Sequence, residues 1–255
     1  MTYMCGTRST GYPARMTETT ESGATVDVWT QWRREFPPLD IDRCPAMVLA
    51  GPHPGDETLG LGATAALLAG RGVTVQVVAI TNGECAYPRR PVHTRAELAE
   101  QRREELLAAA IRLGIPRPWF LGLPDGKVSE NEGRVVHALR EILEECPAGT
   151  WCASTWRGDG PPDHEATARA AATASQEMGA KLVEYPVSMW RWATPDDPAV
   201  PWDRARRVPL TPLELATKAV AVQLFSSQLE PGDGPPALTP QDVDRQMAVG
   251  EIVFV

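Results

Sequence analysis

Two histidines and an aspartate occur at positions suited to metal chemistry. His53 and Asp56 follow the apolar run 46–50, and His164 follows the run 151–154, so each group comes after a segment typical of a buried strand and opens a helical one. If both strand ends face one crevice, the three side chains form a two-histidine, one-carboxylate set that suits zinc and also iron, nickel or cobalt. The alternative is structural, with Asp56 capping its helix and His53 on the surface.

Strands and helices that alternate along the chain would bring these residues together. Thr94 and Glu97 have the spacing of a capping box, and Gly114 is a natural helix end. The alternation predicts an α/β fold: a Rossmann-like, mostly parallel sheet with helices on both faces, in a single domain. Strand patterns occur at 46–50, 73–80, 119–121, 151–154, 182–185 and 252–255, and helical patterns at 57–70, 94–114, 135–143, 166–178 and 212–229.

Two segments differ from this regular pattern. Residues 1–25 are polar and lack apolar periodicity, which predicts a disordered N-terminal arm ahead of a domain at 26–255. The segment 186–212 is rich in tryptophan and proline and predicts an ordered lid or rim. Its side chains Trp190 and Trp192 either line a binding site or pack into the core.

Composition narrows the class of protein. The chain has 255 residues, 25 Lys+Arg against 33 Asp+Glu and a net charge of −8, which argues against a nucleic-acid partner. No run approaches the ~18 apolar residues of a membrane span, and the first thirty residues have no apolar signal region, so we expect no membrane partner and a cytoplasmic location. Five cysteines without Cys-x-x-Cys spacing predict reduced thiols.

Five motifs occur together between residues 40 and 255. They are His-Pro-x-Asp-Glu at 53–57, Thr-Asn-Gly-Glu at 81–84, Arg-x-x-Glu at 102–105, Leu-Gly-Leu-Pro-Asp-Gly at 121–126, and Trp-Arg-Gly-Asp-Gly at 156–160 leading into Asp163-His164. In this combination the sequence resembles the LmbE-like or PIG-L family, whose members remove N-acetyl groups from sugars such as N-acetylglucosamine derivatives.

The resemblance implies a metal-dependent amide hydrolase that acts on an N-acylated small molecule. Its ligand positions correspond to His53, Asp56 and His164 and imply zinc or another divalent transition metal. Arg102 and Asp125 match positions that contact the sugar or phosphate groups of the substrate. A helix ion pair with Glu105 is the alternative for Arg102. Trp192 is our further candidate for substrate binding, as an aromatic wall beside the site.

The sequence departs from the family pattern at the general base. The family motif reads His-Pro-Asp-Asp-Glu, and its first Asp is Gly55 here; the first His of the second motif, His-Pro-Asp-His, is Pro161. Glu57, Glu84 and Asp159 are the nearby acids that could serve as the base, although each could instead be an ordinary helix-terminus or loop carboxylate. A positioned base contributes about 10²–10⁴-fold, so an Asp at position 55 is expected to raise deacetylase activity.

Three functions follow from this mixture of retained and missing groups. The first is a metal-dependent N-deacetylase with a substitute base, in specialised metabolism. The second is a degenerate family member with a binding role. The third is an enzyme that uses the metal as a Lewis acid for a non-hydrolytic step such as cyclisation or isomerisation.

Overall fold

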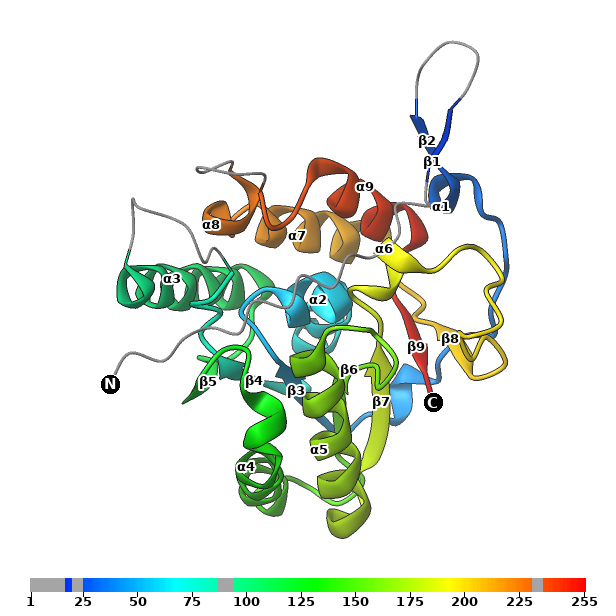
Figure 1. Cartoon of the computed structure of the whole chain (residues 1–255). Coiled ribbons are helices and arrows are strands. Elements are labelled where there is room, and N and C mark those ends of the chain that lie inside the picture. Colours follow the sequence, from blue (N-terminus) through cyan, green and yellow to red (C-terminus); the bar gives the residue numbers. More distant parts are fainter. Residues whose placement is uncertain (1–16, 20–24, 87–93, 231–235) are drawn as a thin grey trace.

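A seven-stranded sheet forms the centre of the computed structural model, which describes residues 17–19, 25–86, 94–230 and 236–255 (Figure 1). The strand order is β5-β4-β3-β6-β7-β9-β8. The first five strands run parallel, and β9 and β8 join the edge antiparallel. The strands are β3 (Ala46–Gly51), β4 (Thr74–Thr81), β5 (Trp119–Leu123), β6 (Trp151–Thr155), β7 (Lys181–Tyr185), β8 (Ala205–Arg207) and β9 (Ile252–Phe254). The prediction of a single, mostly parallel α/β domain is confirmed.

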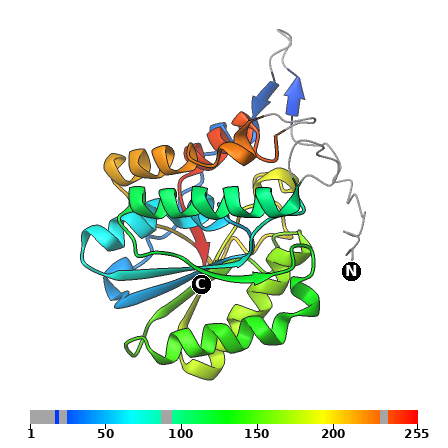
Figure 2. The same ribbon diagram turned by 90° about the vertical axis from the view of Figure 1, so that its left-hand side faces the viewer.

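Helices cover both faces of this sheet, as predicted (Figures 1 and 2). One face carries α2 (Asp56–Gly70), α3 (Arg95–Leu113), α7 (Pro212–Val222), α8 (Ser226–Leu229) and α9 (Pro240–Val249). The other face carries α4 (Glu132–Glu144) and α5 (Pro162–Met178). Short 3₁₀ turns occur at Ile41–Arg43 and Val128–Glu130.

The strand side chains alternate between two cores. On β3, Met47 and Leu49 pack toward α2 and α3, whereas Val48 and Ala50 pack toward α4 and α5. All six β3 residues are buried, which explains why the strand appears in the sequence as an unbroken apolar run. Burial on both faces fixes the register of the central strands and hence the positions of the loops that follow them.

Local signals set the helix ends. Thr94 and Glu97 form the predicted capping box at the start of α3, and Gly114 ends this helix with φ 72°. The helix predicted over 212–229 is divided into α7 and α8. The buried carboxylate of Glu105 on α3 accepts hydrogen bonds from the backbone N–H (2.7 Å) and hydroxyl (2.6 Å) of Ser227, and this anchors α8 as a separate turn.

The segment 186–212 contains more regular structure than the sequence indicates. It contributes α6 (Met189–Trp192) and β8, a strand that the sequence analysis did not predict. The pairing of β8 with β9 at the edge of the sheet fixes residues 205–207 of this segment. Trp202 packs there with Trp32 and Phe36, at ring-centroid distances of 5.0 and 5.8 Å.

The predicted N-terminal arm lies largely outside the described residues. Within it, β1 (Thr17–Thr19) pairs antiparallel with β2 (Thr25–Asp27), followed by the single turn α1 (Val28–Gln31). In the part of the chain that the structure describes, we find no helix with the length and apolar character needed to span a membrane.

Candidate metal centre

The candidate ligands meet where the strand order reverses. From β3 the chain continues outward through β4 and β5, whereas β6 lies on the other side of β3 and continues to β7. The loops after β3 and β6 therefore diverge and leave a crevice at the carboxyl ends of the two central strands. His53 follows β3, Asp56 begins α2, and His164 lies in the first turn of α5.

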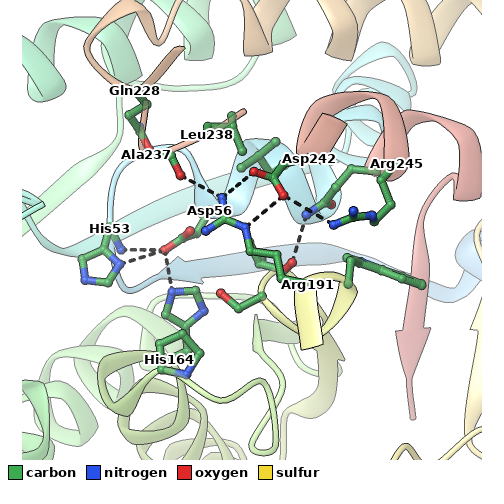
Figure 3. Close-up of a pocket in the computed structure, with 15 residues that line it drawn as sticks. His53, Asp56, His164, Arg191, Gln228, Ala237, Leu238, Asp242 and Arg245 are labelled. Carbon is green, nitrogen blue, oxygen red and sulfur yellow. Dashed lines mark hydrogen bonds and ion pairs between the residues drawn. The ribbon is translucent and has the colours of Figure 1, made fainter. Parts of the chain in front are cut away.

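His53, Asp56 and His164 converge on one point in this crevice (Figure 3). The Oδ2 atom of Asp56 is 3.1 Å from Nδ1 of His53 and 3.4 Å from Nε2 of His164. One ligand atom from each residue lies within 4.8 Å of the other two. Two imidazole nitrogens and a carboxylate oxygen are donors that zinc and related ions prefer, so these residues fit a divalent transition metal.

The loop between β3 and α2 is held in place by hydrogen bonds. The backbone N–H of His53 donates to Oδ2 of Asp56 (3.0 Å), which fixes the ligand aspartate against its own turn. Thr81, at the end of β4, donates from its N–H and hydroxyl to the carbonyl of Pro52, at 3.0 and 2.9 Å. The neighbouring strand thus positions the first ligand.

A buried carboxylate lies behind His164. Oδ2 of Asp159 is 2.7 Å from Nδ1 of His164, so Nε2 faces Asp56. The same carboxylate accepts backbone N–H groups of Val187, Ser188 and Met189, at 2.8 to 2.9 Å. Asp159 is fully buried and is not among the residues that line the cavity. Its contacts are those of a residue that orients a histidine ligand.

His53 has a similar arrangement on its far side. Its Nε2 is 3.1 Å from Oδ1 of Asp125 and 3.5 Å from Oδ2 of Asp163. Asp125 also accepts the N–H of Cys85 (2.7 Å), and Asp163 accepts the N–H of Gly126 (2.7 Å). His53, Asp125 and Asp163 also lie close enough to hold an ion, but these contacts equally orient the ring so that Nδ1 faces Asp56.

Electrostatics favour a protonated His53 in the metal-free protein. Burial would lower the pKa of His53, but Asp125, Asp163 and Asp56 raise it well above its ordinary value of 6.5. Burial would raise the pKa of Asp56, yet the two histidines hold it below 3.8. For Asp125, His53 outweighs burial and lowers the pKa to about 2. Binding of a metal must therefore displace a proton from this group of residues.

The other two candidate bases lie outside the cavity wall. Glu57 is buried, accepts a hydrogen bond from the hydroxyl of Thr58 (2.9 Å), and lies so close to Gly51 that a Cβ there would be 2.8 Å from its Oε2. Burial, opposed by its hydrogen bonds and reinforced by Asp56, raises the pKa of Glu57 to about 7. Glu84 accepts the N–H of Asp125 at 3.1 Å and so supports the loop.

Arg102 has a role in the loop after β4. It is buried and donates to the carbonyl of Gly83 at 2.9 Å. A Cβ at Gly83, where φ is 70°, would lie 2.1 Å from Nη1 of Arg102, so the glycine permits this close approach. Glu105, the alternative partner for Arg102, accepts hydrogen bonds from Ser227 on α8 and from Gln101 on its own helix. Arg102 thus supports the same loop whose Cys85 holds Asp125.

A cavity of about 250 Å³ opens beside the three candidate ligands (Figure 3). Trp190 lines it, whereas Trp192 donates from Nε1 to the carbonyl of Asp159 (2.8 Å) and stacks on Trp156. The other lining residues come mainly from the C-terminal third: Leu59, Pro161, Val187, Ser188, Arg191, Gln228, Ala237, Leu238, Asp242, Arg245 and Gln246. Of these, Arg191 binds the carboxylate of Asp242 through Nε (3.1 Å) and Nη2 (2.9 Å).

Sequence reasoning did not single out the residues of this opposite wall. Gln228 lies in a segment with no recognisable motif, and Asp242 belongs to a Thr-x-x-Asp capping box that marks a helix start but gives no sign of a site. Asp163 had a signal that could have been used, because it directly precedes a candidate ligand at the start of a helix.

The class of protein is indicated by a group of residues at the switch point of an α/β sheet that could hold a metal ion. The PIG-L family, described as GlcNAc-PI de-N-acetylase, matches residues 48–175, which include the three candidate ligands and the carboxylates that contact the two histidines. The chain belongs to this family.

The curated proteins that match this chain in sequence share one name. A 1D-myo-inositol 2-acetamido-2-deoxy-alpha-D-glucopyranoside deacetylase of Mycolicibacterium gilvum is 30% identical over 187 residues, which cover 61% of each chain. The protein of that name from Mycobacterium sp. (strain KMS) is 38% identical over 93 residues, 34% of this chain and 30% of the relative. The matches thus span less than two thirds of either relative.

Solved structures share the fold. The deacetylase of the A40926 pseudoaglycone is 22% identical with a TM-score of 0.59, covering 82% of this chain and 96% of that one. The N,N'-diacetylchitobiose deacetylase from Pyrococcus horikoshii is 21% identical with a TM-score of 0.55, covering 74% and 73%. GalB, the 4-carboxy-2-hydroxymuconate hydratase from Pseudomonas putida, is 18% identical with a TM-score of 0.55, covering 80% and 83%.

Proposed function

We propose that this protein is a zinc-dependent amide hydrolase that removes the acyl group from an N-acylated small molecule, with N-acetyl sugar derivatives as the substrate class. The observation that carries the proposal is the convergence of His53, Asp56 and His164 on one point beside a cavity. The names of the curated relatives, which are deacetylases of an acetamido sugar, support it.

His53, Asp56 and His164 are the proposed metal ligands. When bound, a divalent ion would polarise the carbonyl of the scissile amide and lower the pKa of water. Asp125 and Asp159 hold the two imidazole rings in the orientation that points their free nitrogens at Asp56. We therefore assign these two carboxylates to the positioning of ligands.

The described structure gives no cavity-facing position to the three candidate bases. Asp159 is occupied by His164 and by three backbone N–H groups, Glu57 lies beneath the loop, and Glu84 supports Asp125. The contribution of the chain to catalysis is therefore binding and orientation. Arg102 and Trp192 contribute indirectly, through the Gly83 loop and through the carbonyl of Asp159.

Metal content and amine release test the proposal together. The purified protein is analysed for zinc, nickel, cobalt and iron, and assayed on a panel of N-acetyl sugars before and after chelation. We expect about one zinc per chain, amine release that chelation abolishes, and recovery on addition of zinc. A zinc-loaded protein that releases no amine from any member of the panel would rule out the deacetylase.

The absence of a carboxylate at position 55 favours a second candidate. In a family whose base precedes the ligand aspartate, Gly55 leaves that place without a proton acceptor. A non-hydrolytic Lewis-acid enzyme, or a binding protein on the same scaffold, needs no such base. A zinc-loaded protein that binds carbonyl compounds without hydrolysis would support this candidate.

A cytoplasmic location stays a prediction from the sequence.

A further inference from the structure

Gly55 and Gln228 meet beside the candidate metal ligands. Gly55 has φ 109°, and a Cβ added to it would lie 2.8 Å from Nε2 of Gln228 and 3.5 Å from Cδ1 of Phe225. The side chain of Gln228 therefore occupies the space into which a larger residue 55 would project. Because residue 55 directly precedes Asp56, this contact lies next to a candidate metal ligand.

The side chain of Gln228 is held firmly in that space. Its Nε2 donates to the carbonyl of Pro54 at 2.7 Å, which ties it to the loop that carries His53. Its backbone carbonyl accepts the N–H of Leu238 at 2.9 Å. The adjacent Ser227 is bound by the buried carboxylate of Glu105 on α3. Gln228 is thus fixed by its own contacts to two other parts of the chain and by the anchoring of its neighbour to α3.

The bond to Pro54 also fixes which way the amide points. The carbonyl oxygen of Pro54 needs a donor, so Nε2 must face Pro54 and Oε1 is the acceptor end of the amide. Among the described residues, Oε1 accepts no hydrogen bond. Gln228 lines the cavity together with His53, Asp56 and His164. The wall of this cavity therefore includes an oriented amide that has a neutral acceptor oxygen.

We propose that Gln228 is a substrate-contacting residue whose Oε1 accepts a hydrogen bond from a donor held beside His53, Asp56 and His164. The donor is the N–H of the scissile amide or an O–H of the attacking water. Because an uncharged amide takes up no proton, the group orients its partner and does not act as a base. This inference rests on the proposed hydrolase function.

Gln228→Leu tests the contact, with Gln76→Leu as the matched control. Gln76 on β4 also donates from Nε2 to a backbone carbonyl, at 2.9 Å, but lies away from the cavity. The zinc-loaded proteins are assayed on an N-acetyl amide and on the corresponding O-acetyl ester, which lacks the N–H. Zinc content and thermal unfolding are measured in parallel.

We expect Gln228→Leu to lower kcat/KM for the amide by about 10-fold, the effect of one well-placed hydrogen bond, with zinc retained and Gln76→Leu unchanged. A loss confined to the amide identifies the substrate N–H as the donor, and an equal loss on the ester identifies the water. No loss on either substrate, or the same loss in Gln76→Leu, overturns the proposal.

A second test requires no turnover. Gly55→Ala, Gln228→Ala and the double variant form a thermodynamic cycle measured by thermal unfolding. The strain of a positive φ at residue 55 is the same in the wild type and in Gln228→Ala. The coupling energy between the two substitutions therefore reports only their competition for the same space. We expect Gly55→Ala to lower Tm by several degrees in the wild type and by less in Gln228→Ala. Additive losses would contradict the shared space. If the two substitutions are coupled but the protein hydrolyses neither the amide nor the ester, the packing of Gln228 stands and the proposed hydrolase function is wrong.

Discussion

Asp159 approaches His164 so closely that its Oδ2 lies 2.7 Å from Nδ1 of the ring, and every other contact of this carboxylate is to the backbone of 187–189. The aspartate therefore links the ligand histidine to the segment that begins the cavity wall. The orientation of His164 depends on this link.

Asp159→Asn is expected to weaken zinc binding about 10–100-fold, the usual effect of removing a partner behind a metal ligand. Oδ1 of the asparagine can still accept the N–H groups of Val187 and Met189, so the fold should persist. Competition with a chelating dye measures the affinity. Asp242→Asn is the control, because Asp242 contacts Arg191 and neither ligand histidine. Equal zinc affinity in wild type and Asp159→Asn would contradict the orienting role.

His164→Ala should abolish zinc retention through dialysis, since only two ligands would remain. His137→Ala should retain zinc, because His137 lies exposed on α4 beside Glu141 at 3.4 Å. Elemental analysis of both variants after dialysis measures how much zinc each one retains. Zinc that persists at wild-type content in His164→Ala would exclude this site.

Gly55→Asp is expected to destabilise the protein and to leave deacetylase activity no higher. The sequence alone suggests the opposite, since the family's base would be restored. The structure reverses this expectation because residue 55 has φ 109° and its Cβ would meet Gln228 at 2.8 Å. Thermal unfolding and amine release measure the two effects. A gain in activity of 10-fold or more from this single change would show that the loop rearranges easily.

Glu57→Gln should flatten the pH dependence of stability between about pH 4.5 and 7. Burial raises the pKa of Glu57 from 4.5 to about 7, so the folded state holds a proton that the unfolded state has released. The associated stability is present below pH 4.5 and is lost as the pH rises through 7, by at most about 3 kcal/mol. Urea unfolding of the metal-free protein across this range measures it. The exposed Glu144 supplies a control substitution that should change nothing, and identical slopes for wild type and Glu57→Gln would disprove the assignment.

Trp190→Leu should shift selectivity toward longer acyl groups. Trp190 is buried in the cavity wall and braced by Trp29, whose ring packs edge-on at 4.9 Å. A smaller side chain enlarges the cavity, so turnover of a short-chain N-acyl substrate should fall more than that of a long-chain one. Trp192→Phe, which loses the bond to Asp159, should lower both alike. An unchanged ratio in Trp190→Leu would assign the side chain to packing.

The convergence of the candidate ligands could be predicted because local sequence determines their setting. An apolar run, a turn and a helix start surround both His53 and His164, and parallel strands necessarily bring such turns to one edge of the sheet. The same reasoning identified the central strands, whose burial on both faces leaves a strong hydrophobic signal.

The roles of individual acids could not be predicted in this way. Nothing in the sequence distinguishes Asp159, which orients a ligand, from Glu84, which supports a loop, because the difference lies in contacts with residues far along the chain. The strand β8 was missed for a similar reason: it has three residues, two of them arginines, and exists through pairing with β9.

The two sides of the cavity come from different parts of the chain. The histidines and their carboxylates all fall within residues 48–175, whereas the facing wall, from Trp190 to Gln246, follows that region. The candidate ligands and the opposite wall of the cavity therefore lie in separate, consecutive stretches of the chain. Residues beyond β7 can therefore be exchanged between family members while the candidate ligands and their carboxylates stay unchanged. New substrate ranges could then arise by recombination at a single junction.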